Sequence, residues 1–178
     1  MSLIDLPNTF QPWRKQHFLH HCLDPKITSW LLDSNSLTQR IIKFCGKNKS
    51  QFQVKVLKQG TALPTVSEAT KLNMKTRQWA YIREVLLFCG ETPVVYAKTI
   101  IPLSTLTGKQ RQLAFLGNRP LGAYLFSQHN LHRDPIEISQ VSHNQQQLWA
   151  RRSAFYLDNK PLLVYEVFLS ELLPGSSL

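Results

Sequence analysis

Two charged side chains stand where the sequence otherwise predicts apolar strand faces, and they are the strongest candidates for chemistry. Their neighbours on the same alternating face are Trp79, Tyr81, Val85 and Leu87 for Arg83, and Leu162, Val164 and Phe168 for Glu166. A buried charge is costly unless it meets an opposite charge or a matching ligand. The pattern leaves two interpretations open: a structural ion pair, of Arg83 with Glu166 or with an acid such as Glu84, or a binding site for a charged ligand.

Other residue types that often carry chemistry lack the spacing that the chemistry needs. The histidines fall into two groups, which are His17, His20 and His21 and then His129 and His132. Neither group has a carboxylate or a cysteine at ligand spacing, so no metal site is predicted. Ser104 and Thr105 lack the glycine elbow of a hydrolase nucleophile, which favours a turn or capping role. No glycine-rich phosphate loop is found, which argues against a nucleotide cofactor.

Two neighbouring arginines, Arg151 and Arg152, lie within another predicted strand. Because side chains alternate along a strand, these two must point to opposite faces of the sheet. We expect one of them to face solvent and the other to face the packed side of the sheet.

The chain carries a formal net charge of +10 over 178 residues. A basic surface can attract nucleic acid, a membrane surface or small anions. Here the lysines and arginines are spread along the chain, and no helix-turn-helix or RNA-binding motif accompanies them. We interpret the charge mainly as solvated surface and predict no nucleic-acid partner.

The composition is that of a soluble globular protein, with 43% hydrophobic and 18% charged residues. The longest apolar runs are too short to span a membrane, and the first residues do not form the basic start and apolar block of a secretory signal. Cys22, Cys45 and Cys89 are odd in number and lack metal spacing, so we predict free thiols in the cytoplasm. We expect a monomer with one domain over residues 1–178.

The N-terminal third predicts a helical hairpin over residues 24–46. Asp24 can cap a first helix, and Pro25 suits the first helical position. Ser36 can cap a second helix, which Gly46 is expected to end.

Residues 51–169 mainly show the period of strands. We expect strands over 52–58, 78–89, 94–101, about 132–143, 148–158 and 161–169, a loop over 60–76, and a helix over 109–116 that ends at Gly117. Short turns between the strands indicate antiparallel pairing. The prediction is an α+β fold with a single antiparallel sheet of about five or six strands, helices on one side, the helical hairpin, and a lead-in of residues 1–22.

Six short segments follow one another in order between residues 30 and 169. They are SLTQR (36–40), WAYIREVLL (79–87), IPLSTLTG (101–108), PLGAYLF (120–126), LWARRS (148–153) and KPLLVYEVF (160–168). In order and spacing these segments resemble the chorismate pyruvate-lyase family of ubiquinone and plastoquinone biosynthesis. The resemblance implies a single antiparallel sheet whose helical hairpin acts as a flap over an internal site.

The resemblance also implies a role for individual residues. Arg83 matches the residue that binds the ring carboxylate, and Glu166 matches the residue that faces the 4-hydroxyl end of the ring. Leu121 and Leu37 match positions that contribute backbone amides. Leu37 departs from the family, in which this flap position is often Met, but a backbone donor tolerates a change of side chain.

The activity that the resemblance implies is the cleavage of chorismate into 4-hydroxybenzoate and pyruvate. Aromatisation of the ring drives this reaction, so neither a metal nor another cofactor is expected. Arg83 offers a planar fork for a carboxylate. Glu166 can orient the 4-hydroxyl or act as the base at C4, and both roles stay open.

A second function from the same fold family is a small-molecule sensor. Effector-binding domains of certain bacterial repressors share the fold and do no chemistry, but they normally follow a winged-helix segment. This chain has no room for such a segment before its sheet, and Arg83 with Glu166 fits the lyase pattern. The lyase interpretation is therefore favoured.

Overall fold

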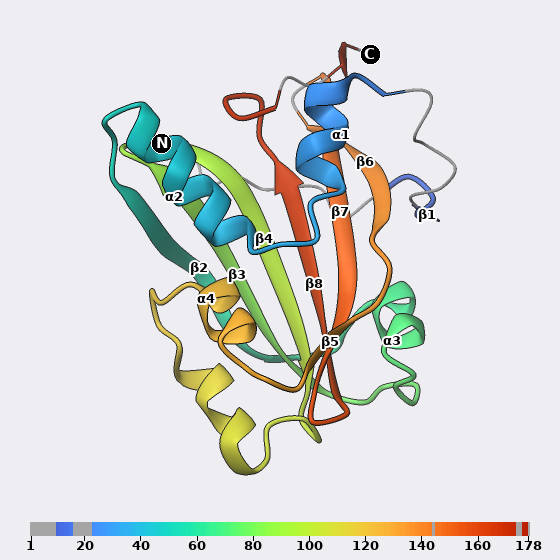
Figure 1. Ribbon diagram of the computed structural model, residues 1–178. Coiled ribbons are helices and arrows are strands. Elements are labelled where there is room, and N and C mark those ends of the chain that lie inside the picture. Colours follow the sequence, from blue (N-terminus) through green and yellow to red (C-terminus); the bar gives the residue numbers. More distant parts are fainter. Residues whose placement is uncertain (1–9, 16–22, 144, 174–175, 178) are drawn as a thin grey trace.

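The computed structural model describes residues 10–15, 23–143, 145–173 and 176–177. Within these residues, nine strands form one antiparallel sheet in the order β1-β6-β7-β8-β4-β3-β2, and β5 and β9 also pair with β7 (Figure 1). The strands are β1 (Arg14–Lys15), β2 (Phe52–Ala62), β3 (Ala80–Cys89), β4 (Thr92–Pro102), β5 (Leu131–Arg133), β6 (Glu137–His143), β7 (Gln146–Leu157), β8 (Lys160–Phe168) and β9 (Ser176–Ser177). The α+β class and the antiparallel sheet are as predicted.

The sheet is larger than the five or six strands expected. Three strands, β1, β5 and β9, have only two or three residues, which is too short for an alternating pattern to be visible. The strand expected over 132–143 is in fact two strands, β5 and β6, with Pro135 between them. Proline has no backbone N–H to donate to a ladder, so it interrupts the pairing.

The predicted helical hairpin is formed by α1 (Pro25–Leu31) and α2 (Leu37–Lys47), which we call the flap. The side chain of Asp24 accepts a hydrogen bond from the Lys26 amide, and that of Ser36 accepts one from the Gln39 amide, so both caps are confirmed. Gly46 does not end α2. The helix continues to Lys47, and Lys49 takes the positive φ of 54°.

Three shorter helices follow: α3 (Val66–Lys71), the 3-10 helix η2 (Gly108–Phe115) and α4 (Leu121–Phe126). The segment around α3 was expected to be a loop, because six residues are too few to show a helical period. Its start is nevertheless fixed by a capping box between Thr65 and Glu68. Gly117, with φ 54°, follows η2 as expected.

Different elements cover the two faces of the sheet. The flap, η2 and α4 lie on the face toward the viewer in Figure 1, which we call the front face and which includes Thr99. On the back face, Glu68 of α3 pairs with Lys98, and Trp13 packs edge-on against Tyr165. The prediction that the helices gather on one side is therefore wrong for α3.

Cys45 of α2 and Cys89 of β3 form a disulfide with their Cα atoms 5.3 Å apart. The prediction of free thiols is wrong for this pair, because spacing in the sequence does not reveal that the end of α2 packs on the end of β3. The bridge joins the flap to the strand that carries Arg83. Cys22 lies outside the described residues.

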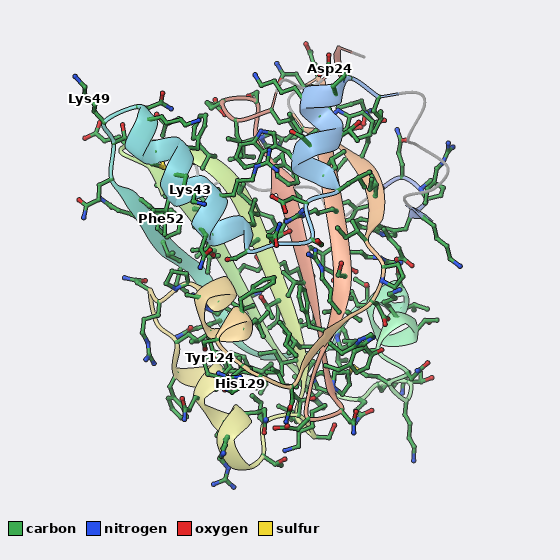
Figure 2. The ribbon with its side chains drawn as sticks, in the orientation of Figure 1. Asp24, Lys43, Lys49, Phe52, Tyr124 and His129 are labelled. Atoms are coloured by element: carbon green, nitrogen blue, oxygen red, sulfur yellow. A yellow bond between two sulfur atoms is a disulfide. The ribbon has the colours of Figure 1, made fainter. Side chains whose placement is uncertain are left out.

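No helix among the described residues is long and apolar enough to cross a membrane. Lys43 of α2 and Lys49, which follows α2, are both exposed (Figure 2).

Candidate active site

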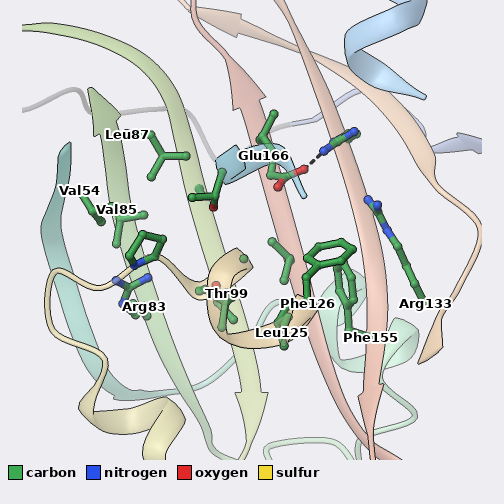
Figure 3. A pocket seen from close by; sticks show the side chains of 18 of the residues that line it. Val54, Arg83, Val85, Leu87, Thr99, Leu125, Phe126, Arg133, Phe155 and Glu166 are labelled. Carbon is green, nitrogen blue, oxygen red and sulfur yellow. Dashed lines mark hydrogen bonds and ion pairs between the residues drawn. The ribbon is translucent and has the colours of Figure 1, made fainter. Parts of the chain in front are cut away.

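A pocket lies on the front face between the flap and α4 (Figure 3). It contains roughly 590 Å³ of empty space, its opening included. Its walls come from the flap, α4 and six of the strands, so the site exists only once the sheet has assembled.

The floor of the pocket is made of two rows of residues that lie opposite one another across β3, β4, β8 and β7. The first row is Arg83, Thr99, Val164 and Ser153, and the second is Val85, Ala97, Glu166 and Arg151. The middle of each row has small or medium side chains. Larger side chains fill the front face on either side, where Trp30 of α1 packs against Phe168 of β8 and Leu113 of η2 shares an apolar cluster with Phe155 of β7. The hollow follows from this change in side-chain size.

Arg83 stands at the β3 end of the first row and is only 3% exposed. One of its terminal nitrogens, Nη2, donates to the carbonyls of Gly117 at 2.8 Å and Arg119 at 3.1 Å. Its Nε is buried and has no hydrogen-bond partner among the described residues. Burial lowers the pKa of this guanidinium. Backbone carbonyls thus fix the group at the pocket wall while part of its donor capacity is unused.

Glu166 stands in the second row and pairs with Arg151 rather than with Arg83. Its Oε2 accepts a hydrogen bond from Nε of Arg151 at 2.5 Å, the interaction drawn as a dashed line in Figure 3. Arg151 is 1% exposed, and its Nη1 also donates to the carbonyls of Trp30, Leu31 and Asp33 at the end of α1. The structural alternative of an Arg83–Glu166 ion pair is therefore wrong. Arg151 instead ties Glu166 to the flap.

The first residues of α2 and α4, Leu37 and Leu121, face each other across the rim of the pocket. Gly122 allows α4 to lie this close to α2, because a Cβ at this position would be 2.6 Å from the Thr38 hydroxyl oxygen. Amides in the first turn of a helix have no acceptor within the helix. Two such amides beside one pocket suit a ligand that accepts hydrogen bonds.

Arg133 of β5 lies on the opposite side of the pocket from Arg83 (Figure 3). Its Nε donates to the Ser153 hydroxyl at 3.0 Å, its Nη1 donates to the Ser34 carbonyl at 3.1 Å, and its guanidinium carbon lies 4.9 Å from the centre of the Phe155 ring. Burial lowers its pKa to about 10, and the nearby charge of Arg151 acts in the same direction. Arg133 was not predicted as a site residue, because the sequence pattern merged β5 and β6 into one strand over 132–143 and the three residues of β5 alone do not show which way their side chains point.

The structure brings the residues that the resemblance singled out to one pocket: Leu37, Arg83, Leu121 and Glu166 all line it. Arg151 and Arg152 enter opposite faces, as the alternation predicts. The expectation that one of them faces solvent is wrong, since they are 1% and 7% exposed. The sequence did carry a sign of this burial, because Arg151 and Arg152 stand in a strand that is otherwise largely apolar.

The remaining candidates lie away from the pocket. His129 and His132 are exposed, and His17, His20 and His21 lie outside the described residues. Within the described part of the chain, no group of three or more His, Cys, Asp or Glu residues is placed to hold a metal ion. Thr105 is fully buried and donates to the Pro161 carbonyl at 2.7 Å, which agrees with a structural role in its turn.

Comparison with known sequences gives a consistent result. Residues 10–174 match the family described as chorismate lyase. A protein of Psychromonas ingrahamii named probable chorismate pyruvate-lyase is 41% identical over 164 residues, which cover 80% of this chain and 82% of that protein. The chorismate pyruvate-lyase of Pectobacterium atrosepticum is 38% identical over 151 residues, which cover 84% of this chain and 80% of that protein.

Solved structures resemble the chain in fold at much lower identity. A GntR-family transcriptional regulator from Bacillus cereus has a TM-score of 0.54 at 14% identity and covers 72% of this chain and 99% of its own. The effector domain of PhnF from Mycobacterium smegmatis has a TM-score of 0.53 at 10% identity and covers 74% of this chain and 88% of its own. At these identities the likeness concerns the fold alone.

Proposed function

The chain belongs to the chorismate lyase family, and we propose that it eliminates pyruvate from chorismate to give 4-hydroxybenzoate in the pocket beneath the flap. The observation that carries this proposal is the family match over residues 10–174, combined with a pocket lined by arginines. The sensor alternative is not favoured. The regulators of similar fold are far more distant in sequence than the lyases.

The reaction breaks two bonds of the substrate ring system. The ether bond between C3 and the enolpyruvyl oxygen breaks, and C4 loses its hydrogen, so that the ring becomes aromatic. When the enolpyruvyl methylene takes that hydrogen, it becomes the methyl group of pyruvate and the former ether oxygen becomes the pyruvate carbonyl. All atoms of chorismate are then accounted for in the two products. The enzyme mainly has to hold the conformer in which these groups meet.

We assign the ring carboxylate to Arg83. Its guanidinium is fixed by the carbonyls of Gly117 and Arg119, and its unpartnered Nε leaves a donor for an anion. A planar fork that is already immobilised loses little side-chain entropy on binding. The backbone amides of Leu121 and Leu37, one on each side of the rim, are assigned as further donors to the ligand.

We assign Glu166 to the 4-hydroxyl of the ring. Because Oε2 is held by Arg151, Oε1 is the oxygen left to accept a hydrogen bond from the ligand. A carboxylate fixed in this way holds the C4 end of the ring, so that together with Arg83 at the C1 end it sets the direction of the ring's long axis. We propose orientation as its main role, and the alternative role as the C4 base is separated from it by a variant described in the Discussion.

The direct test is incubation of the purified protein with chorismate and no added metal or nucleotide. We expect equal amounts of 4-hydroxybenzoate and pyruvate, and the same rate in the presence of EDTA. Formation of 3-hydroxybenzoate or prephenate, or no turnover at all, would contradict the proposal. The 4-hydroxybenzoate formed would supply quinone biosynthesis.

The chain is further proposed to work as a monomer with one domain over residues 1–178, in the cytoplasm and without nucleic acid. Sedimentation should give a single species near 20.5 kDa. Duplex DNA should bind weakly and dissociate near physiological salt, since scattered charges form few phosphate contacts. The Cys45–Cys89 disulfide is a feature more typical of oxidising compartments, so thiol titration of protein isolated without reductant tests the cytoplasmic assignment.

A further inference from the structure

The charges of the pocket are not balanced by the protein itself. Of the three arginines that line it, only Arg151 has a carboxylate partner within the described residues. Arg83 is held by backbone carbonyls, and Arg133 is held by a hydroxyl and a carbonyl. Glu166 is the acidic residue of the lining, so two positive charges are left for a ligand. Chorismate carries two carboxylates, and the ring carboxylate uses only one of these cations.

The two unbalanced arginines stand at opposite ends of the same floor row. Arg83 begins the row, which continues through Thr99 and Val164 to Ser153, and Arg133 is hydrogen-bonded to that serine. Four strand spacings separate β3 from β5, which is roughly 19 Å between backbones. The two long side chains lie on opposite sides of the hollow (Figure 3). A ligand that spans the row can therefore meet a guanidinium at each end.

Arg151 is a poorer candidate for the second carboxylate. Its Nε is bound to Glu166, and its Nη1 is shared among the carbonyls of Trp30, Leu31 and Asp33. A carboxylate that approached it would compete with the ion pair that fixes Glu166. Arg133 makes fewer contacts and no ion pair within the described residues, so it can accept a carboxylate without giving up a charged partner.

We propose that Arg133 binds the carboxylate of the enolpyruvyl side chain of chorismate, and that it forms the subsite from which pyruvate is released. This inference rests on the proposed function and assigns the half of the substrate that Arg83 and Glu166 leave without a partner. Three fixed points, one for each polar group, define a single orientation of the substrate. They hold the enolpyruvyl methylene close to the C4 hydrogen that it takes up.

A second, outer groove lies next to Arg133. Arg133 and Phe126 line both the inner pocket and an outer groove beside β5, which also includes Ser34 and His132. The Phe126 side chain is 39% exposed and lies at the boundary between the inner pocket and the outer groove. Pyruvate bound at Arg133 therefore lies beside this outer groove, whereas the aromatic product lies deeper, against Arg83.

The test compares two ligands that differ in one carboxylate. 4-Hydroxybenzoate carries only the ring carboxylate, whereas 3-(1-carboxyethoxy)-4-hydroxybenzoate is already aromatic and also carries the second one. In Arg133→Gln, the Kd of the two-carboxylate ligand and the KM for chorismate should rise about 10- to 100-fold, the range for hydrogen bonds to charged groups. The Kd of 4-hydroxybenzoate should change less than about threefold, because the ring contacts are intact. Arg133→Lys keeps the charge but not the fork and should fall between the two.

The ratio of the two Kd values is the decisive readout, because any general damage to the pocket weakens both ligands and leaves their ratio unchanged. The exposed Arg111 provides the matched control, since Arg111→Gln removes the same charge outside the pocket and should leave the ratio unaltered. The assignment would be overturned if Arg133→Gln and Arg133→Lys weakened the binding of both ligands equally, or if the ratio of the two Kd values stayed that of the parent. A parent protein that neither cleaves chorismate nor binds 4-hydroxybenzoate would instead contradict the proposed function. A parent active on chorismate with an unchanged ratio in the variants contradicts only the subsite.

Discussion

Arg151 and Arg152 are adjacent in β7, enter opposite faces of the sheet and meet two differently built groups of charges. On the back face, Nε of Arg152 donates to Glu137 at 2.7 Å, and its Nη1 donates to the hydroxyls of Ser67 and Tyr165. Glu137 also accepts from Lys71 at 2.9 Å. A further pair on this face, Lys98 with Glu68, is separated by 2.8 Å. Each of these cations has an acid within the protein.

On the front face, the charges are only partly paired. The Arg151–Glu166 pair is complete, but Arg83 and Arg133 have no acidic partner within the described residues. The attraction between two buried partners offsets part of the desolvation cost, whereas a charge buried without a partner bears that cost in full. The comparison indicates that the back face is built for a fixed structure, whereas the front face leaves two cations for the anionic ligand proposed above.

The largest effect is expected on the front face, in Arg83→Met. Removing the ring carboxylate's partner should lower kcat/KM for chorismate about 1000-fold or more, since several charge-assisted hydrogen bonds are lost. The free energy of unfolding should fall by only about 1 kcal/mol, because the guanidinium has carbonyl acceptors but no buried acid that its loss would leave unpaired. Steady-state kinetics measures the first quantity and thermal denaturation the second. With 4-hydroxybenzoate added, the melting temperature of the parent should rise and that of the variant should not. A variant that unfolds at room temperature, or that keeps the full product-induced shift, would return Arg83 to a purely structural role.

The next largest effect concerns the back face. Arg152→Met deprives Glu137 of one of its two cations and should lower the free energy of unfolding by about 3 kcal/mol. The activity of each folded molecule should remain within about twofold of the parent, because the side chain points away from the pocket. Urea denaturation and steady-state kinetics on one preparation measure both quantities. Equal stability losses in Arg152→Met and Arg83→Met would remove the contrast between the faces.

A smaller effect is expected for Glu166→Gln, which keeps a hydrogen-bonding group but removes the base. If orientation is the main role, kcat should fall about tenfold or less, whereas loss of a general base typically costs 10²–10⁴ in rate. Single-turnover kinetics with saturating chorismate isolates this step. A drop beyond about 1000-fold with substrate affinity intact would show that Glu166 removes the C4 proton.

The smallest effect is the pH dependence that Glu137 gives to the back face. Burial raises the pKa of this carboxyl, but the hydrogen bonds from Lys71 and Arg152 outweigh burial and hold the pKa below its usual value of 4.5. A lowered pKa in the folded state contributes stability above pH 4.5, and this contribution is lost as the pH falls through the folded value. Urea titrations between pH 7 and pH 3 should therefore show a weaker acid dependence in Glu137→Gln than in the parent. If the free energy of unfolding depended on pH equally in the variant and the parent, the pairing of Glu137 with Lys71 and Arg152 would not lower its pKa in solution.

Local rules were sufficient for several elements. Asp24 and Ser36 cap the flap helices as expected, and Asp158 with Asn159, both at positive φ, makes the tight turn between β7 and β8. Alternation along β3 and β8 was enough to single out Arg83 and Glu166 as charges on apolar faces. These features depend on residues that are close in sequence, so the chain alone determines them.

The partners of those charges were decided only by the tertiary structure. The sequence left open whether Arg83 pairs with Glu166, with Glu84 or with a ligand. The register places Arg151 directly opposite Glu166, and two loop carbonyls hold Arg83. Arg133 lines the pocket from β5, whose three residues are too few to show which side chains point to which face of the sheet. Its carbonyl partner, on Ser34, is 99 residues away. Pairing across a sheet depends on strand order and register, which fix contacts between residues far apart in the chain and which no local pattern encodes.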